Sequence, residues 1–183
     1  MRSRKKHEPS IFTLLLLLIL LLKGSTFGAA TDTIVATVER VSDGDTIIAF
    51  TSNQTKLRLR FLDIDAPEVP HGKKPGQPYG EKARDYLDHR MGGKTVRVDA
   101  YGPYKYKRVL AVVWDEQVNV NLLIAALGYA EVYWGTTCQT SCQELDNAEA
   151  KATLDGVGMW VHGGKYESPA EFRRRIRFAG IRC

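Results

Sequence analysis

The chain has 183 residues, of which 44% are hydrophobic, and a formal net charge of +5 at pH 7. It contains no internal repeat and no long linker, so its length predicts one ordinary domain rather than several. The first 30 residues hold five basic side chains and one acidic one, and without them the formal charge falls from +5 to +1. Global charge therefore gives little support for a nucleic-acid partner, and any positive surface must be local.

The chain opens with a segment rich in Arg and Lys, followed by an apolar, mostly leucine stretch at 11–22. This layout is typical of a signal peptide. The apolar stretch is too short for a membrane-spanning helix, which needs roughly twenty residues, so an anchor is the less favoured interpretation. Small residues at 28–30 suit cleavage after them. We expect a signal peptide at 1–30 and a secreted or periplasmic domain at 31–183, without stable membrane association.

The first part of the domain predicts three strands. Residues 33–41 and 45–51 are rich in β-branched side chains and flank the turn-like Ser42-Asp43-Gly44, as in a hairpin. The third strand, 55–64, alternates leucine and phenylalanine on one face with arginine on the other. Arg60 should therefore point away from the side chains that fill the core.

The second part predicts two more strands and up to four helices. The strands are expected at 94–100 and about 106–114, and the helices at 79–91, 119–127, 144–155 and from Ser168-Pro169 onward. The resulting order, β-β-β-α-β-β-α with a further helix, fits an α+β fold. We expect a five-stranded OB-type β-barrel with three or four flanking helices. A parallel α/β architecture is disfavoured, because the strands come in runs.

Three carboxylates crowd the end of the third predicted strand, in Asp63-Ile64-Asp65-Ala66-Pro67-Glu68. Like charges this close repel unless a cation or arginines neutralise them. A hard divalent cation suits such oxygen-only ligands, and no nearby His or Cys favours a softer metal. By contrast, Asp43-Gly44-Asp45-Thr46 taken alone is an ordinary hairpin turn.

Two arginines are available to this acidic cluster. Arg60 lies five residues before Asp65, and Arg108 occupies a polar position among apolar neighbours in the last predicted strand. The planar fork of an arginine matches two phosphate oxygens. Two arginines, a metal ion and a glutamate are what in-line attack on a phosphodiester needs. Taken singly, however, either arginine is more simply a surface residue of an exposed strand face.

Together these motifs carry a family resemblance. D-G-D-T between two strands, then R-x-x-x-x-D-x-P-E, a helix, and K-Y-x-R-x-L-A in a later strand resemble the staphylococcal nuclease (thermonuclease) family in identity, order and spacing. The resemblance runs from about Ile34 to Trp160. It implies a calcium-dependent nuclease that hydrolyses phosphodiester bonds of DNA or RNA and leaves 3′-phosphate products. We expect such an enzyme to act as a monomer.

The resemblance also assigns metal ligands by position. Asp45 and Asp65 match the calcium carboxylates, and Ala66 matches a residue that supplies its backbone carbonyl. Asp43 matches an acidic residue beside these ligands. Glu68 matches the residue that acts as general base or organises the attacking water.

The same comparison assigns contacts with the substrate. Arg60 and Arg108 match the pair that stabilises the transition state, and Lys105 and Tyr106 match residues that hold a neighbouring phosphate. The family usually has Gly immediately before the second arginine, where this chain has Lys107. This substitution constrains the backbone that presents Arg108, or strengthens phosphate binding through the added charge.

Aromatic and cysteine residues lie near a less certain part of the match. Tyr133 and Trp134 either stack on a base of the substrate or pack in the core. Cys138 and Cys142 sit on a loop that should flank the site, so a disulfide there would stiffen its rim. Cys183 makes the number of cysteines odd, which leaves the pairing open, and a lone C-x-x-x-C is a poor zinc signature.

Two other functions fit parts of the sequence. D-x-D after an apolar strand is how haloacid dehalogenase-like phosphatases place their nucleophile, but Pro67 and the strand order argue against that class. The stronger alternative is a non-catalytic OB-type module that binds single-stranded nucleic acid. The arginines of the last helix, at positions 173, 174, 175 and 177, are interpreted as a solvated helix face in preference to a track for a nucleic-acid backbone.

Overall fold

The computed structural model describes most of the predicted domain. The described residues are 30–101, 108–133, 135, 138–163 and 165–179. Apart from Ala30, the predicted signal peptide lies outside them. Among the helices of the described part, none is both long and apolar enough to cross a membrane.

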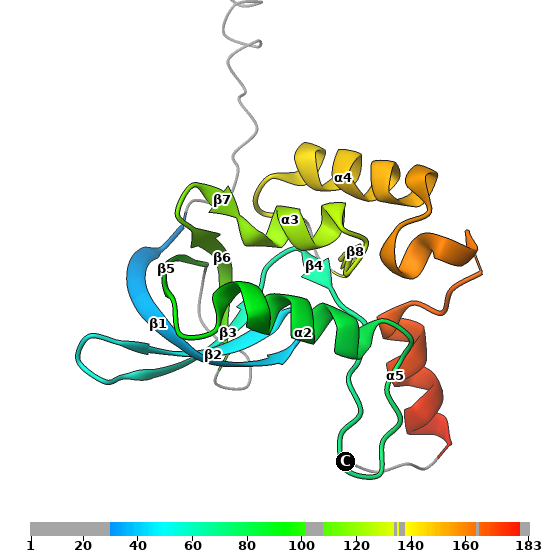
Figure 1. Ribbon diagram of the computed structural model, residues 1–183, viewed down its shortest axis with the longest axis horizontal. Coiled ribbons are helices and arrows are strands. Elements are labelled where there is room, and N and C mark those ends of the chain that lie inside the picture. Colours follow the sequence, from blue (N-terminus) through cyan, green and yellow to red (C-terminus); the bar gives the residue numbers. More distant parts are fainter. Residues whose placement is uncertain (1–29, 102–107, 134, 136–137, 164, 180–183) are drawn as a thin grey trace, which may run out of the picture.

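Five strands close into a barrel (Figure 1). They are β1 (Asp32–Asp43), β2 (Thr46–Thr51), β3 (Lys56–Phe61), β5 (Thr95–Tyr101) and β6 (Val109–Asp115). Antiparallel pairing gives the order β3-β2-β1-β5-β6, and parallel pairing of β3 with β6 closes the ring. Two shifts of register in β1 mark bulges, which bend this long strand so that it pairs on both sides. The predicted five-stranded α+β barrel is confirmed.

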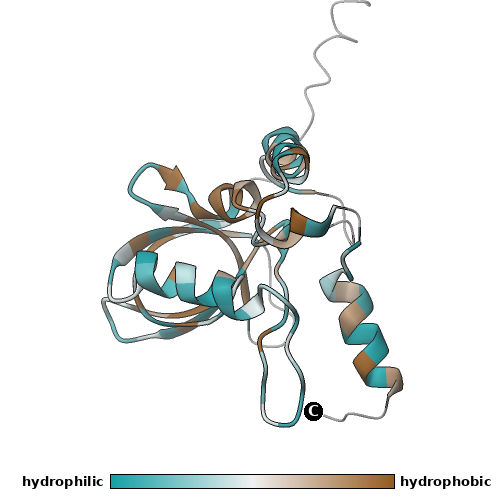
Figure 2. Cartoon of the chain, turned by 45° about the vertical axis from the view of Figure 1, so that its right-hand side comes forward, coloured by the Kyte–Doolittle hydropathy of each residue, from teal (hydrophilic) through white to brown (hydrophobic). Residues whose placement is uncertain are grey.

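The alternating pattern of β3 explains which side chains fill the barrel. Leu59 and Phe61 are 0% and 1% exposed, whereas Arg58 is exposed and Arg60 is half-buried on the opposite face. Hydrophobic colour is concentrated on the strands of the barrel, whereas the helices carry more hydrophilic residues (Figure 2). The apolar face of the strand therefore packs in the core, and its arginines lie on the outer face.

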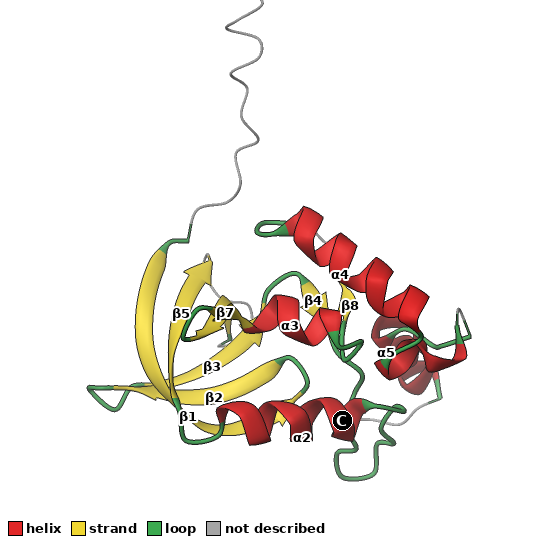
Figure 3. Ribbon diagram, turned by 45° about the horizontal axis from the view of Figure 1, so that its top comes forward, coloured by secondary structure: helices red, strands yellow, loops and turns green. Residues whose placement is uncertain are grey.

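In the described part of the chain, four helices flank the barrel, which agrees with the predicted three or four. They are α2 (Gly80–Met91), α3 (Val120–Ala126), α4 (Cys142–Asp155) and α5 (Pro169–Phe178), and a 3₁₀ helix covers Gly158–His162. Helices α3 and α4 lie together beside the barrel (Figure 3), and α5 lies below them in the view of Figure 1, near the start of α2. Helix α5 begins with a capping box between Ser168 and Glu171, followed by Pro169.

The third predicted strand, 55–64, is wrong in its last part. The chain leaves β3 after Phe61, turns through Asp63 with φ of 62°, and resumes as the two-residue strand β4 (Ile64–Asp65). Strand β4 pairs with β8 (Glu131–Val132), and β7 (Val118–Asn119) extends the main sheet beside β6. The sequence pattern predicted none of these three short strands as a separate element. The first hairpin turn also lies one residue later than predicted, at Gly44-Asp45.

Asn121 ties the closing strands of the barrel to α3. This buried side chain accepts a hydrogen bond from the Val113 backbone N–H and donates to the carbonyls of Leu62 and Ala111. We expect Asn121→Ala to lower the free energy of unfolding by about 3 kcal/mol, because it leaves buried backbone groups without partners. Denaturant unfolding measures this. Asn147→Ala, at an exposed position of α4, is the control and should change stability by less than about 0.5 kcal/mol.

Candidate active site

The turn between β1 and β2 presents Asp45 to the start of the following loop. A Cβ at Gly44 would lie 2.7 Å from the Cβ atoms of both Ala66 and Ala83, so only glycine permits this close approach. The Ala66 backbone N–H donates to Asp45 Oδ2 at 2.8 Å, and Thr46 Oγ1 donates to Asp45 Oδ1 at 2.9 Å. Asp45 is therefore fixed against the segment that carries Asp65 and Ala66.

Arg60 joins the two predicted metal carboxylates. Its Nη2 donates to Asp65 Oδ1 at 2.6 Å, and its Nη1 contacts Asp45 Oδ1. Asp45 and Asp65 are only 1% and 0% exposed. Buried carboxylates need a positive partner, and here one guanidinium serves both. The structure thus brings together three residues that are up to 20 positions apart in the sequence.

Pairing with β8 holds Asp65 in place. Asp65 lies opposite Glu131 in the β4–β8 pair, and Tyr133 N–H donates to the Asp63 carbonyl at 2.9 Å. Burial raises the pKa of Glu131 to about 7, although the hydroxyl of Tyr166 donates to its carboxylate and acts in the opposite direction. Glu131 therefore adds another acidic group behind Asp65 that the sequence pattern did not reveal.

An arginine from α5 enters the same cluster. Arg173 Nη2 donates to Asp65 Oδ2 at 2.7 Å, and Arg173 Nη1 donates to Glu68 Oε1 at 2.8 Å and to Asp65 Oδ1 at 3.0 Å. The interpretation of the terminal arginines as a solvated face is therefore wrong for Arg173, although Arg174 and Arg177 are exposed. Three carboxylates (Asp45, Asp65 and Glu68) thus meet two guanidiniums.

Gln77 fixes the backbone of Glu68. The Glu68 N–H donates to Gln77 Oε1 at 3.0 Å, and the Gln77 N–H donates to the Glu68 carbonyl at 2.8 Å. Gln77 Nε2 also donates to the carbonyl of Glu167, just before α5. This side chain is 9% exposed, and it connects the acidic loop to the helix that supplies Arg173. Sequence reasoning missed it, because a glutamine in a polar loop carries no distinguishing pattern.

Asp43 and Arg108 lie near this cluster without joining its ion pairs. Asp43 Oδ1 accepts from the Asp45 N–H at 3.2 Å, which supports its predicted place beside the metal ligands. Burial raises the pKa of Asp43, and the positive charges of Arg60, Arg58 and Arg108 oppose that rise. Arg108 is half-buried and forms no ion pair within 4.0 Å in the part of the chain that the structure describes.

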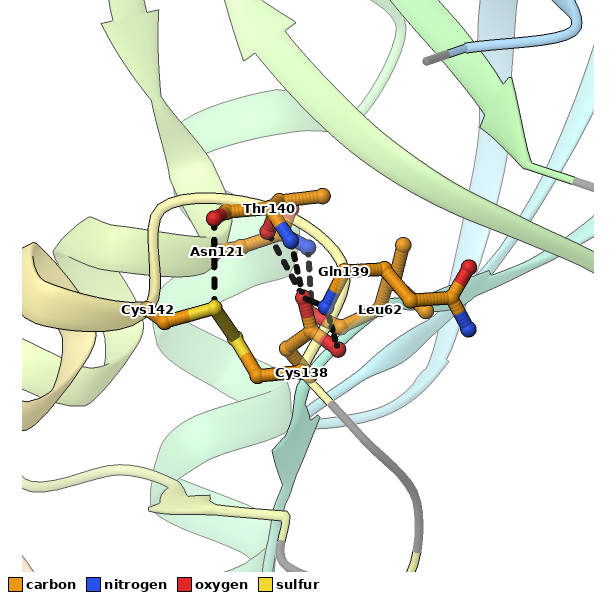
Figure 4. The surroundings of a disulfide bond; sticks show 7 residues. Leu62, Asn121, Cys138, Gln139, Thr140 and Cys142 are labelled. Carbon is orange, nitrogen blue, oxygen red and sulfur yellow. Dashed lines mark hydrogen bonds between the residues drawn. A yellow bond between two sulfur atoms is a disulfide. The ribbon is translucent and has the colours of Figure 1, made fainter. Parts of the chain in front are cut away.

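A disulfide between Cys138 and Cys142 closes the loop before α4 (Figure 4). The buried Asp63 carboxylate accepts hydrogen bonds from the backbone N–H groups of Gln139 and Thr140 and from the Thr140 hydroxyl. These contacts fasten the loop to the turn that precedes Asp65.

The remaining predicted substrate contacts fall at the edge of the described chain. Tyr133 is 36% exposed, so it does not pack in the core, and it follows β8 directly. Lys105, Tyr106 and Trp134 lie outside the described residues. The structure accordingly places Tyr133 beside the site and leaves the other three as predictions.

The donor set fits a hard divalent cation. Asp45 and Asp65 converge on a single guanidinium, which shows that both carboxylates can share one positive charge. Across the described ranges, no group of three or more His, Cys, Asp or Glu side chains is arranged to hold a metal ion. A cation here would therefore take two carboxylates and the Ala66 carbonyl, and it would need water or substrate oxygens to reach the six to eight ligands typical of Ca²⁺.

Comparisons with known proteins identify the family of this chain. The model of the family described as Staphylococcal nuclease homologue matches residues 58–162. An uncharacterized endonuclease of Haemophilus influenzae is 32% identical over 139 residues, which cover 75% of this chain and 72% of that protein. The probable endonuclease LCL3 of Uncinocarpus reesii is 35% identical over 66% of this chain and 45% of its own length. Endonuclease YhcR of Bacillus subtilis is 35% identical over 79% of this chain but only 13% of its own length. The chain belongs to the staphylococcal nuclease homologue family, whose members are nuclease hydrolases and generally depend on a metal ion.

Proposed function

We propose that this protein is an exported, monomeric, calcium-dependent endonuclease that hydrolyses phosphodiester bonds of DNA or RNA and leaves 3′-phosphate ends. The observation that carries the proposal is the buried Asp45 and Asp65 pair joined by Arg60, with Glu68 held beside it by Arg173. The names of the relatives and the metal dependence of the family support the same activity. Export rests on the basic and apolar start of the chain.

Asp45, Asp65 and the Ala66 carbonyl would hold the calcium ion. When bound, the ion supplies a Lewis acid that withdraws charge from the scissile phosphate. The Arg60 contacts with the two carboxylates use two of the five N–H donors of its guanidinium, and the others remain for phosphate oxygens. Arg108, immediately before the neighbouring strand β6, adds a second fork. Together the two arginines would stabilise the charge that grows on the equatorial oxygens in the transition state.

Glu68 is the proposed base. Arg173 holds its Oε1, and Oε2 accepts no hydrogen bond from any residue in the described ranges, which leaves this oxygen available to a water molecule. The water oxygen forms a bond to phosphorus while its proton passes to Glu68 Oε2. The bond between phosphorus and the 5′-oxygen breaks, and the leaving oxygen takes a proton from solvent water, to which Glu68 later returns the proton it accepted. The products are a 3′-phosphate end and a 5′-hydroxyl end.

The proposed function is tested with closed circular single-stranded DNA and a labelled single-stranded RNA, each incubated with the purified protein and calcium. Opening of the circle demonstrates cleavage within the strand, since a circle has no ends for an exonuclease. We expect the new 3′ ends to resist extension by a polymerase until a phosphatase removes their phosphate. Ends that are extended directly would contradict the proposed direction of cleavage.

Arg173 is expected to position Glu68 rather than to obstruct the site. Arg173→Gln should lower kcat by about 10-fold to 100-fold, because Glu68 and Asp65 lose the guanidinium that orients both. Arg173→Lys should restore part of the rate, since it returns the charge without the planar fork. Steady-state cleavage kinetics measure both variants. A rate at or above that of the wild type for Arg173→Gln would show that the arginine blocks the site.

A further inference from the structure

A pocket of about 490 Å³ opens beside the candidate active site, between α5 and the outer face of β1, β2 and β3. Glu68 and Arg173 line the side that borders the site. Ile48, Phe172 and Ile176 contribute buried apolar side chains to the lining. Its volume lies within the range of about 300 to 1,000 Å³ that is usual for small-molecule pockets. None of the roles assigned above uses this space.

Strand pairing places two arginines on the barrel side of this pocket. Arg40 on β1 pairs with Ile48 on β2, and Ile48 pairs with Arg58 on β3. Residues paired in this way project from the same face of a sheet. Ile48 is only 4% exposed although it lies outside the main core cluster, because this face is covered where α5 contributes Phe172 and Ile176 to the pocket. The two arginines therefore flank an apolar floor.

Arg40 and Arg58 form no ion pair with any described residue, although the positive charge of Arg58 acts on the nearby Asp43 carboxylate. Both side chains are exposed and line the pocket, and neither lies within 4.0 Å of a carboxylate belonging to a described residue. By contrast, the arginines at positions 84, 90 and 97 each pair with an aspartate. Free guanidiniums suit phosphate oxygens, and an apolar floor between them suits a sugar or a base.

The pocket is continuous with the proposed catalytic residues. Arg58 lies two residues before Arg60 on the same face of β3, a separation of about 6.6 Å along the strand. The parallel register pairs Leu59 with Val109, and continuing it by one residue sets Arg108 beside Arg58. A phosphate held between Arg60 and Arg108 therefore has Arg58 as its neighbour on the pocket side.

We propose that this pocket binds the phosphate and the sugar or base of a nucleotide next to the scissile bond, with Arg40 and Arg58 as its phosphate contacts. The inference rests on the proposed function, because the ligand of the pocket is the part of the nucleic-acid strand next to the bond that is cut. Both arginines lie away from the reacting phosphate, so they contribute to binding of substrate and transition state alike. Their loss should raise KM and leave kcat unchanged.

Binding is tested with a fluorescent single-stranded DNA oligonucleotide in a chelator, so that no cleavage occurs. Arg40→Ala and Arg58→Ala should each weaken binding about tenfold, the loss expected for a charge-assisted hydrogen bond. Each should also reduce the slope of log affinity against log salt concentration by about 0.7, the value for one phosphate contact on a single strand. Arg84→Ala on α2 is the matched control and should change neither quantity.

Cleavage in calcium gives the second readout. Substrates with one scissile bond are extended by single nucleotides on the 5′ or the 3′ side. Extension on one side should lower KM for the wild type and for Arg84→Ala, and this gain should disappear in Arg40→Ala and Arg58→Ala. Thermal melting of each variant checks that the barrel remains folded.

The outcomes separate the two proposals. If both arginine variants matched the wild type in binding, in salt slope and in KM, the pocket assignment would be overturned. The proposed nuclease function would still stand. A wild type that binds the oligonucleotide through Arg40 and Arg58 but cuts in no metal would refute the nuclease function and keep the pocket as a binding site. A wild type that does not bind the oligonucleotide would overturn the pocket assignment as well.

Discussion

Glu68→Gln is expected to lower kcat for cleavage of single-stranded DNA by about 10²-fold to 10⁴-fold, the usual contribution of a general base. Glutamine has the shape of glutamate, and its carbonyl oxygen can still accept the hydrogen bond from Arg173 Nη1. The backbone bonds with Gln77 are also unchanged. The variant therefore keeps the local structure and removes only the oxygen that can take a proton from water.

The matched control for this variant is Glu81→Gln. Glu81 lies on α2 with a side chain that is 63% exposed, and its contact with Arg84 is 4.0 Å long. We expect the same loss of one negative charge to leave kcat and KM unchanged there. A Glu68→Gln protein that retains more than about a third of the wild-type kcat would exclude Glu68 as the base.

Arg60→Lys is expected to lower kcat by about 10²-fold to 10³-fold. This is the fall in kcat that follows removal of one preorganised hydrogen-bond donor to a developing anion. Lysine preserves the positive charge between Asp45 and Asp65, so the buried carboxylates keep a partner. It cannot reproduce the planar fork that contacts both carboxylates and still offers donors to a phosphate. The loss should therefore appear in the rate rather than in the folding of the barrel.

Cleavage kinetics and thermal melting, measured on the same preparation, separate these effects. Arg84→Lys tests the same exchange on α2, where the arginine contacts only acidic neighbours on its own helix. That control should behave like the wild type in both measurements. If Arg60→Lys melted normally and retained more than a tenth of the wild-type kcat, Arg60 would not be the donor to the transition state.

The barrel was predictable because its strands carry local signals. Alternation in β3 separates Leu59 and Phe61 from Arg58 and Arg60 before any partner strand is known. The short strands β4 and β8 carry no such signal, since two residues are too few for a period. Their pairing arises only after the chain has turned at Asp63, whose positive φ and buried carboxylate depend on a loop about 76 residues away.

The candidate site was predictable where its residues form a motif. Asp45, Arg60, Asp65 and Glu68 fall in short, recognisable runs, and the structure brings them together. Arg173 belongs to no such motif, because the packing of α5 against the protein decides whether its side chain contacts water or a carboxylate. One signal was present in the sequence: Phe172 and Ile176 lie four residues apart and mark a face of α5 that packs against the protein. Arg173 lies at the edge of that face.

The proposed function requires a metal ion at the site formed by the acidic cluster, the arginines and α5. The most direct test is cleavage of single-stranded DNA by the chain from Thr31 to Cys183, measured with added calcium and with a chelator. We expect rapid cutting in calcium and none in the chelator, with activity restored when calcium is returned in excess. Binding of DNA without cutting in calcium or in any other divalent metal would contradict it and identify the chain as a non-catalytic OB-type binding module.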